Sequence, residues 1–262
     1  MEGPVSVRRD GPVFRIDLAR PAKKNALDLA TLAALQEHLG AASADDAVRV
    51  IVLGAEGDNF CAGGDIEVMR QFKSDGQAAL ERLRNGLNRL VTMIHASPKP
   101  IIAAVQGNAY GAGAALAFQC DLPVLAKEAT FSLSFRHMGL IPDTGATWLF
   151  PRALGLPRAK HLAWTAAPFT ADDAVAWGLA LKAVPKAQLE GTVKNLADAL
   201  AEGPAATMAL TKRALHANLD ATLSDALERE ARLQATAFGT AEHAEGRDAF
   251  FARRKPDFRR AP

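Results

Sequence analysis

Short apolar segments alternate with longer helical patterns over the first two thirds of the chain. The segments Val13–Leu18, Val48–Leu53 and Pro100–Val105 are rich in Val and Ile and are bounded by Gly, Pro or charged residues, as buried strands are. Between them, Asp28–Leu39 and Gly76–Ile94 carry apolar residues at helical spacing, and the first range begins with an Asp suited to cap a helix. This alternation predicts an α/β fold in which loops at the strand ends carry the site.

After about Val184 the pattern becomes wholly helical. Leu189–Leu200, Pro204–Leu219 and Leu223–Phe238 each show helical spacing, and a Gly-Pro pair separates the first two. We therefore expect a core formed by residues 1–200 and a helical C-terminal subdomain formed by residues 201–262.

Composition and charge exclude several protein classes. The chain has 262 residues, of which 49% are hydrophobic and 23% charged, as in globular proteins with a sizeable core. A net charge of +2 gives no argument for a nucleic-acid partner. The sequence shows neither an apolar run of about 20 residues nor a signal-peptide pattern, so we expect a cytoplasmic protein without a membrane partner. Cys61 and Cys120 lack partners at metal-ligand spacing, and no metal site is predicted.

Common enzyme signatures are missing from the sequence. There is no phosphate-binding P-loop, no His-x-x-x-His pair and no Gly-x-Ser-x-Gly elbow. Gly111 and Gly113 are followed by Leu116, where a dinucleotide fingerprint requires glycine or alanine. The sequence thus argues against P-loop, zinc hydrolase, serine hydrolase and Rossmann chemistry.

Two glycine-rich segments remain, Asn59–Ile66 and Gly107–Ala115. Each follows a predicted strand and precedes a predicted helix, where backbone N–H groups lack helical partners and point outward. Two such loops brought together can donate two N–H groups to one carbonyl oxygen, which is how an oxyanion hole is built. The alternative, that both are tight turns that only pack strand against helix, stays open on these grounds alone.

Four segments taken together resemble the crotonase (enoyl-CoA hydratase/isomerase) superfamily in order and spacing. They are Arg20-Pro21 together with Asn25-Ala26-Leu27, then FCAGGDI, KPIIAAVQGNAYGAGAALAFQCD and GLIPDTGATWLFPRALG. The resemblance implies a spiral of ββα units with a helical trimerisation subdomain, and an acyl-CoA substrate bound by a homotrimer or dimer of trimers. It places the two oxyanion-hole donors on Gly64 and Ala112, and implies no bound cofactor beyond the coenzyme A of the substrate.

The same resemblance implies which residues contact coenzyme A or the thioester. They are Ala22, Lys23, Lys24, Ala62, Gly63, Asp65, Ile66, Gly111, Phe135 and Lys255, the last reaching the ligand from the same or a neighbouring subunit. Roles without a ligand stay open for some of these residues. The lysines can belong to solvated segments, and Asp65 can simply cap the following helix.

The motifs also indicate which reaction to expect. Hydratases of the superfamily use two glutamates, and the matching positions here hold Ala115 and Phe135, which transfer no proton. A carboxylate stands instead at Asp143, where some isomerases of the superfamily, ring-1,2-epoxyphenylacetyl-CoA isomerases in particular, carry a catalytic aspartate. The resemblance therefore favours an isomerase of fatty-acid or phenylacetate metabolism over a hydratase. We expect apolar neighbours to raise the pKa of Asp143.

Four alternatives remain. Asp143 can be a turn former or helix cap. It can be a nucleophile, as in the aroyl-CoA dehalogenases of the superfamily, or the chain can act as a hydratase or hydrolase on another acyl-CoA. The chain can also be a non-catalytic binding protein, like the RNA-associated members. The sequence does not identify the acyl group.

Overall fold

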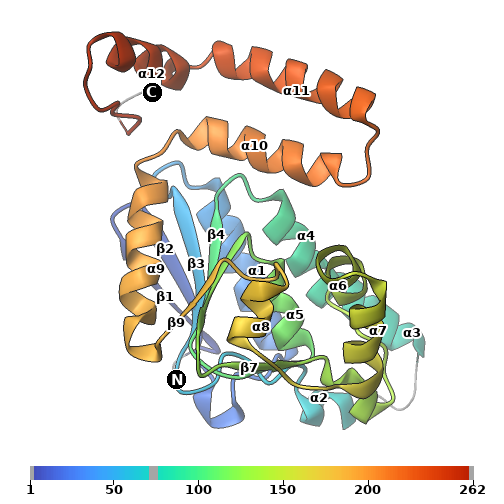
Figure 1. Ribbon diagram of the computed structural model, residues 1–262. Helices are drawn as coiled ribbons and strands as arrows, with labels where there is room; N and C mark the ends of the chain where they lie inside the picture. Colours follow the sequence, from blue (N-terminus) through green and yellow to red (C-terminus); the bar gives the residue numbers. More distant parts are fainter. Residues whose placement is uncertain (1–2, 71–75, 260–262) are drawn as a thin grey trace.

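A six-stranded sheet forms the centre of the computed structural model, which describes residues 3–70 and 76–259. Its strand order is β1-β2-β3-β4-β6-β9 (Figure 1). The strands are β1 (Val5–Asp10), β2 (Val13–Leu18), β3 (Val50–Ala55), β4 (Ile101–Val105), β6 (Leu122–Ala126) and β9 (Lys182–Val184). β1 and β2 form an antiparallel hairpin, and every later neighbouring pair is parallel. Loops that follow parallel strands therefore gather at one edge of the sheet.

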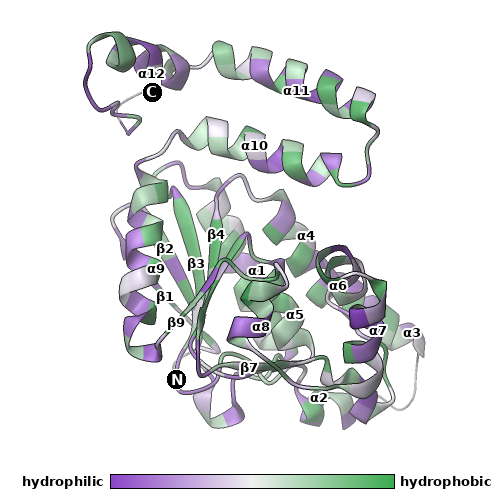
Figure 2. Ribbon diagram, in the orientation of Figure 1, coloured by the Kyte–Doolittle hydropathy of each residue, from purple (hydrophilic) through white to green (hydrophobic). Residues whose placement is uncertain are grey.

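Successive side chains of the central strands pack on opposite faces of this sheet. On β3, Val50 and Val52 face α9 (Lys186–Ala201), whereas Ile51 and Leu53 belong to the larger core. That core is covered by α1 (Leu29–Ala44), α4 (Arg89–Ala96) and α5 (Ala112–Gln119). Because both faces are covered, β3 and β4 are almost wholly apolar rather than alternating (Figure 2).

A smaller sheet holds the glycine-rich loops in register. It contains β5 (Ala109–Tyr110), β7 (Thr130–Ser132) and β8 (Phe169–Thr170), with β5 parallel and β8 antiparallel to β7. Two isolated bridges extend this pairing, Cys61 to Ala109 and Leu27 to Gly64. Three chain segments distant in sequence are thereby fixed side by side.

Short helices connect these layers, and one predicted helix is broken. The remaining elements of the core are η1 (Pro21–Lys23), α2 (Ile66–Arg70), α3 (Gly76–Leu83), the π-helical turn η2 (Arg84–Asn88), η3 (Ser134–Met138), α6 (Ala146–Leu154), α7 (Leu156–Thr165) and α8 (Ala171–Ala176). The predicted helix Gly76–Ile94 is thus interrupted by the π-turn. Gly86 of that turn lies so close to α1 that a Cβ atom would sit 3.0 Å from Leu32.

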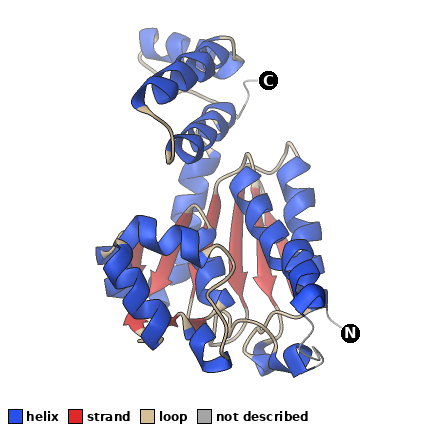
Figure 3. Cartoon of the chain, turned by 90° about the vertical axis from the view of Figure 1, so that its right-hand side faces the viewer, coloured by secondary structure: helices blue, strands red, loops and turns tan. Residues whose placement is uncertain are grey.

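Three helices, α10 (Ala205–Asn218), α11 (Leu223–Phe238) and α12 (Ala241–Phe251), stand beyond one end of the large sheet (Figures 1 and 3). Sequence periodicity predicts the first two closely, whereas α12, capped by Thr240, was not predicted. Lys212 of α10 anchors the subdomain to the core: its Nζ lies 2.7 Å from Asp121 and donates to the carbonyl of Ile94. Within residues 3–70 and 76–259, no helix is long and apolar enough to cross a membrane.

Candidate active site

The two glycine-rich loops meet at Gly63 and Ala112. A Cβ atom on Gly63 would lie 3.5 Å from the Ala112 nitrogen and 2.8 Å from the Tyr110 carbonyl oxygen, so the backbones are nearly in contact. Gly63 also has a φ of +98°, which side-chain-bearing residues rarely adopt. Glycine at this position is therefore required both by backbone conformation and by the close approach of the second loop.

The backbone amide of Gly64 differs from the amides beside it in its hydrogen bonding. The amides of Ala62, Gly63 and Asp65 donate to Lys24, to the Cys61 sulfur and to Leu27, respectively. The Gly64 amide between them has no acceptor in the part of the chain that the structure describes.

Ala112 opens α5, so its amide precedes the helical hydrogen-bond ladder. On either side of it, Gly111 donates to Ser132 and Ala115 donates to Gly111. The two sequence-predicted donors, Gly64 and Ala112, therefore lie where the two glycine-rich loops meet, since Gly64 directly follows Gly63.

The loop that precedes α1 lies against the first glycine-rich segment. Lys24 and Asn25 both have left-handed backbones, with φ of 49° and 56°. The buried Asn25 amide donates to the carbonyls of Glu56 and Asn59, and Ala62 donates to the Lys24 carbonyl at 3.0 Å. These bonds hold the exposed residues 22–24, which were predicted to contact coenzyme A, beside the oxyanion loop.

Asp65 organises this loop through both oxygens. Arg20 donates to Oδ2 at 3.0 Å, and the amide of Glu67 donates to Oδ1 at 3.0 Å, the bond of a helix cap. Burial alone would raise the pKa of Asp65, but the bonds from Arg20 and Glu67 hold that pKa below its ordinary value. Lys23 forms an exposed ion pair with Glu67 at 3.1 Å, and Ile66 is exposed.

Asp143 lies in a turn, residues 141–145, that leads into α6. The hydroxyl of Thr144 donates to Asp143 Oδ1 at 2.8 Å, and Ala146 donates to the Asp143 carbonyl. Burial raises the pKa of Asp143 above 3.8, while the bond from Thr144 opposes that rise. The predicted direction of the pKa shift is confirmed, and Met138 and Leu140, the apolar residues that precede this turn, are half exposed.

Positions 115 and 135, which match the hydratase glutamates of the superfamily, hold buried apolar residues in this structure. Ala115 is fully buried in α5. Phe135 is buried in η3, and its ring reaches to 4.0 Å from the position of a Cβ on Gly111. Phe135 therefore packs beside Gly111 in the second glycine-rich loop, and its side chain cannot donate a proton.

Lys255 lies apart from this cluster, whereas Cys61 lies within the first glycine-rich segment. Lys255 follows α12 and pairs at 2.5 Å with Glu202, which follows α9, so in this chain it lies by the C-terminal helices and not at the glycine-rich loops. Cys61 is buried, and burial raises the pKa of its thiol to about 12, which argues against a nucleophilic role. In the described ranges 3–70 and 76–259 there is no cluster of three or more His, Cys, Asp or Glu residues that could hold a metal.

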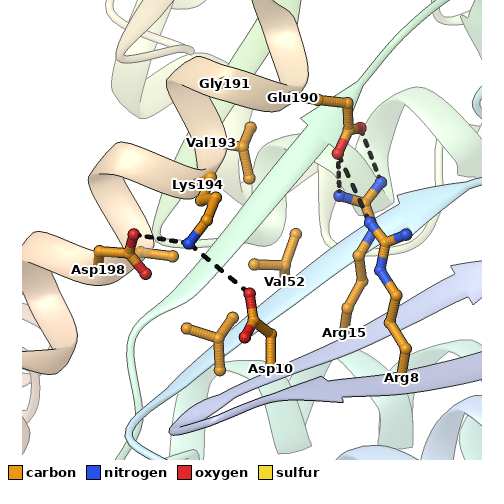
Figure 4. A pocket seen from close by; sticks show the side chains of 11 residues that line it. Arg8, Asp10, Arg15, Val52, Glu190, Gly191, Val193, Lys194 and Asp198 are labelled. Atoms are coloured by element: carbon orange, nitrogen blue, oxygen red, sulfur yellow. Dashed lines mark hydrogen bonds and ion pairs between the residues drawn. The ribbon is translucent and has the colours of Figure 1, made fainter.

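A separate cavity of about 450 Å³ lies between α9 and the first strands (Figure 4). Its cations all face carboxylates: Arg15 bonds Asp17 and Glu190, and Lys194 lies between Asp10 and Asp198. This groove offers a paired charge network rather than a reactive group.

Comparison with known proteins adds to this geometry. The family model described as enoyl-CoA hydratase/isomerase matches residues 8–261. The chain belongs to the enoyl-CoA hydratase/isomerase family. It is 37% identical to the 1,2-epoxyphenylacetyl-CoA isomerase of Escherichia coli K12, over 94% of each chain. It is also 39% identical to a probable enoyl-CoA hydratase of Rhodobacter capsulatus, over 93% of each.

Solved structures confirm the fold of this crotonase-superfamily member. The crystal structure of an enoyl-CoA hydratase of Mycobacterium smegmatis superposes with a TM-score of 0.93 at 31% identity, covering 98% of this chain and all of the other. The expected crotonase fold with C-terminal helices is thus shown. The relatives include both isomerases and hydratases, so membership in the family does not select the reaction.

Sequence reasoning missed two residues near Asp143. Gln119 ends the apolar helix α5, is almost fully buried, and donates to the Thr144 carbonyl at 3.0 Å. Thr144 itself has a φ of 54°, unfavourable for a β-branched residue. A glutamine closing an otherwise apolar run was the available signal, because buried amides require partners.

Proposed function

We propose that this chain is an acyl-CoA isomerase that moves a double bond, or rearranges a ring epoxide, through an enolate held by the Gly64 and Ala112 amides. Asp143 is the acid and base in this proposal. The observation that supports it most is the partly buried Asp143 carboxylate with its raised pKa, in a chain whose positions 115 and 135 supply no carboxylate. One carboxylate is sufficient for isomerisation because it can move a proton between two carbons.

For double-bond movement, Asp143 removes a proton from a carbon next to the double bond of the acyl chain. The electron pair of that C–H bond moves toward the thioester carbonyl, and the oxygen becomes an enolate that accepts hydrogen bonds from the two amides. Asp143 then returns the proton to another carbon, so substrate and product have the same formula. Because Thr144 occupies Oδ1, we assign the proton transfer to Oδ2.

The substrate's coenzyme A is proposed to lie along residues 22–24 and 62–66. Lys23 reaches a phosphate in this proposal by leaving Glu67, and an exposed ion pair of this kind opens at a small energetic cost. Lys24 lies beside it on the same exposed loop. Lys255 reaches coenzyme A only from a neighbouring subunit.

The proposed assembly is a homotrimer or a dimer of trimers. The C-terminal helices leave large apolar side chains exposed in the single chain, namely Leu215, Leu219, Leu223, Leu227, Phe238, Phe250 and Phe251. Such a surface supports burial against another copy. Sedimentation velocity tests this: a monomer at micromolar concentration would refute the assembly.

Incubation of the protein with 3-enoyl, dienoyl and ring-epoxide CoA thioesters tests the reaction. We expect double-bond movement or ring rearrangement, detected by absorbance and mass spectrometry, and slow hydration of crotonyl-CoA. Asp143→Asn is expected to lower turnover by about 10²- to 10⁴-fold while binding of the CoA thioester persists. Asp172→Asn, at an exposed carboxylate of α8, is the matched control and keeps full activity.

Three outcomes would contradict the proposal. Rapid crotonyl-CoA hydration would favour a hydratase, in agreement with the name of the Rhodobacter relative. A covalent adduct on Asp143, detected by mass spectrometry, would favour a nucleophilic dehalogenase or hydrolase. Salt-dependent RNA binding without turnover of any thioester would favour a non-catalytic protein.

A further inference from the structure

Two side chains outside the glycine-rich loops, those of Gln119 and His95, support the turn that carries Asp143. Gln119 Nε2 donates to the Thr144 carbonyl at 3.0 Å. Gln119 Oε1 lies 2.7 Å from His95 Nε2. Gln119 is the last residue of α5, the helix whose first residue supplies the Ala112 amide. One rigid helix therefore connects the proposed oxyanion hole to the support of the proposed base.

The direction of these hydrogen bonds is fixed by chemistry. The Gln119 amide nitrogen is the donor to Thr144, so Oε1 is the atom facing His95, and a carbonyl oxygen only accepts. His95 Nε2 must therefore carry a proton. His95 in turn packs edge-on to Trp148, at a ring distance of 5.6 Å, and lies 4.7 Å from the ring of His216. These contacts restrict the rotation of the imidazole.

The backbone of Thr144 and Gly145 leaves room for the side-chain amide of Gln119. Thr144 has a left-handed backbone, followed by Gly145 with a φ of 73°. A Cβ atom on Gly145 would lie 2.3 Å from Gln119 Nε2, so only glycine lets the amide pass. An unfavourable backbone at Thr144 persists only where surrounding bonds enforce it, and the bond from Gln119 is directed at that residue's carbonyl.

We propose that Gln119 is a positioning residue for Asp143, fixing the Thr144 carbonyl so that the adjacent carboxylate is held in its reactive orientation, and that His95 orients the Gln119 amide. This inference rests on the proposed role of Asp143. Gln119 itself touches no reacting atom in this account. Its contribution passes through the backbone of Thr144, whose hydroxyl bonds the Asp143 carboxylate.

Gln119→Met tests the proposal because it keeps the side-chain length and removes both polar atoms. We expect kcat on the isomerised thioester to fall about 10- to 100-fold with KM changed less than twofold, since misplacing a reactive group by about 1 Å has effects of this size. In a plot of kcat against pH, the acid limb should also shift along the pH axis. Gln119→Leu, which also removes both polar atoms, should show the same loss if Gln119→Met fails to fold.

Gln36→Met is the matched control. The Gln36 amide also donates to backbone carbonyls, those of Asn85 and Gly86 at 2.8 and 2.9 Å, but at the π-turn rather than at Asp143. We expect this variant to lose some stability in urea and to keep the kcat profile. Equal losses of kcat in Gln36→Met and Gln119→Met would show a general structural effect and overturn the proposal.

The role of His95 is tested by rescue. His95→Leu removes the donor to Gln119 and should reproduce the loss of kcat, whereas His95→Gln supplies another N–H and should recover most of it. An unchanged kcat in His95→Leu, with the fold intact by circular dichroism, would overturn this part of the proposal.

A double variant separates failure of this inference from failure of the proposed function. If Asp143→Asn leaves only a small residual turnover, adding Gln119→Met should not lower that residual turnover further, because both act on one group. If Asp143→Asn is fully active, the proposed function is wrong. If Asp143→Asn is inactive but Gln119→Met retains wild-type kcat, only the positioning role is wrong.

Discussion

Gly63 lies so close to Ala112 that a methyl group on Gly63 would sit 3.5 Å from the Ala112 backbone nitrogen. The two residues are 49 positions apart in the sequence, and they meet because the Cys61–Ala109 bridge holds their loops side by side. This contact brings the loop that contains Gly64 up to the first turn of α5, which begins at Ala112. It is the structural basis of the proposed oxyanion hole.

Gly63→Ala should therefore damage this site. The added methyl group would meet the Tyr110 carbonyl at 2.8 Å, and the φ of +98° would strain an alanine, so the loops must separate. We expect a loss of about 10²- to 10³-fold in kcat, the effect of removing one oxyanion donor. To check the cause, acetoacetyl-CoA is added as an enolisable thioester: we expect the wild type to raise its near-ultraviolet enolate absorbance and Gly63→Ala to lose that rise. Gly191→Ala, with open space around it on α9, is the control and should remain active.

Thr144→Val should move the acid limb of the activity profile to higher pH. Asp143 acts as a base only when ionised, and the Thr144 hydroxyl favours the ionised form. Removing that hydroxyl raises the pKa of Asp143 further, so more acid-side activity is lost. Thr144→Ser keeps the hydroxyl and should keep the wild-type profile. A kcat profile that is the same for the Val and Ser variants would contradict this link.

Asp143→Asn should stabilise the fold at neutral pH even as it removes activity. Because the folded-state pKa of Asp143 is raised, its contribution to stability is present below the unfolded pKa and is lost as pH rises through the folded pKa. The neutral amide avoids that loss. Urea unfolding should thus show the variant more stable than wild type at pH 7, with the difference shrinking toward pH 3. A variant less stable at pH 7 would show that the carboxylate is stabilising when charged.

Lys212→Met should loosen the C-terminal helices. The Lys212–Asp121 pair is largely buried, with side-chain exposures of 11% and 16%, and Lys212 also donates to two backbone carbonyls. We expect a loss of about 1.5–3 kcal/mol in unfolding free energy, as for hydrogen bonds to charged groups. Limited proteolysis between α9 and α10 should also become faster. Lys194→Met removes only exposed pairs and should change neither measurement.

The sequence predicted the elements whose signals are local. The β2 range Val13–Leu18 and the α11 range Leu223–Phe238 agree with the structure to the residue, and Asp28 caps α1 through the amide of Thr31. Periodicity and caps depend on neighbouring residues along the chain, so they can be read without knowledge of the fold.

Other elements depended on contacts between distant segments. β3 begins at Val50 rather than Val48 because its pairing partners in β2 and β4 set the register. The π-turn inside the predicted helix Gly76–Ile94 lies where Gly86 packs on Leu32 of α1.

For the site, the sequence by itself determined which chemistry is available: two glycine-rich loops that can donate amides, one carboxylate at Asp143, and apolar residues at positions 115 and 135. The tertiary structure decided what these groups experience. Sheet pairing brought the two glycine-rich loops together, burial raised the pKa of Asp143, and packing placed the Gln119 amide on the turn beside that carboxylate. Proximity and desolvation arise only when segments far apart in the chain pack together, so no local pattern in the sequence could specify them.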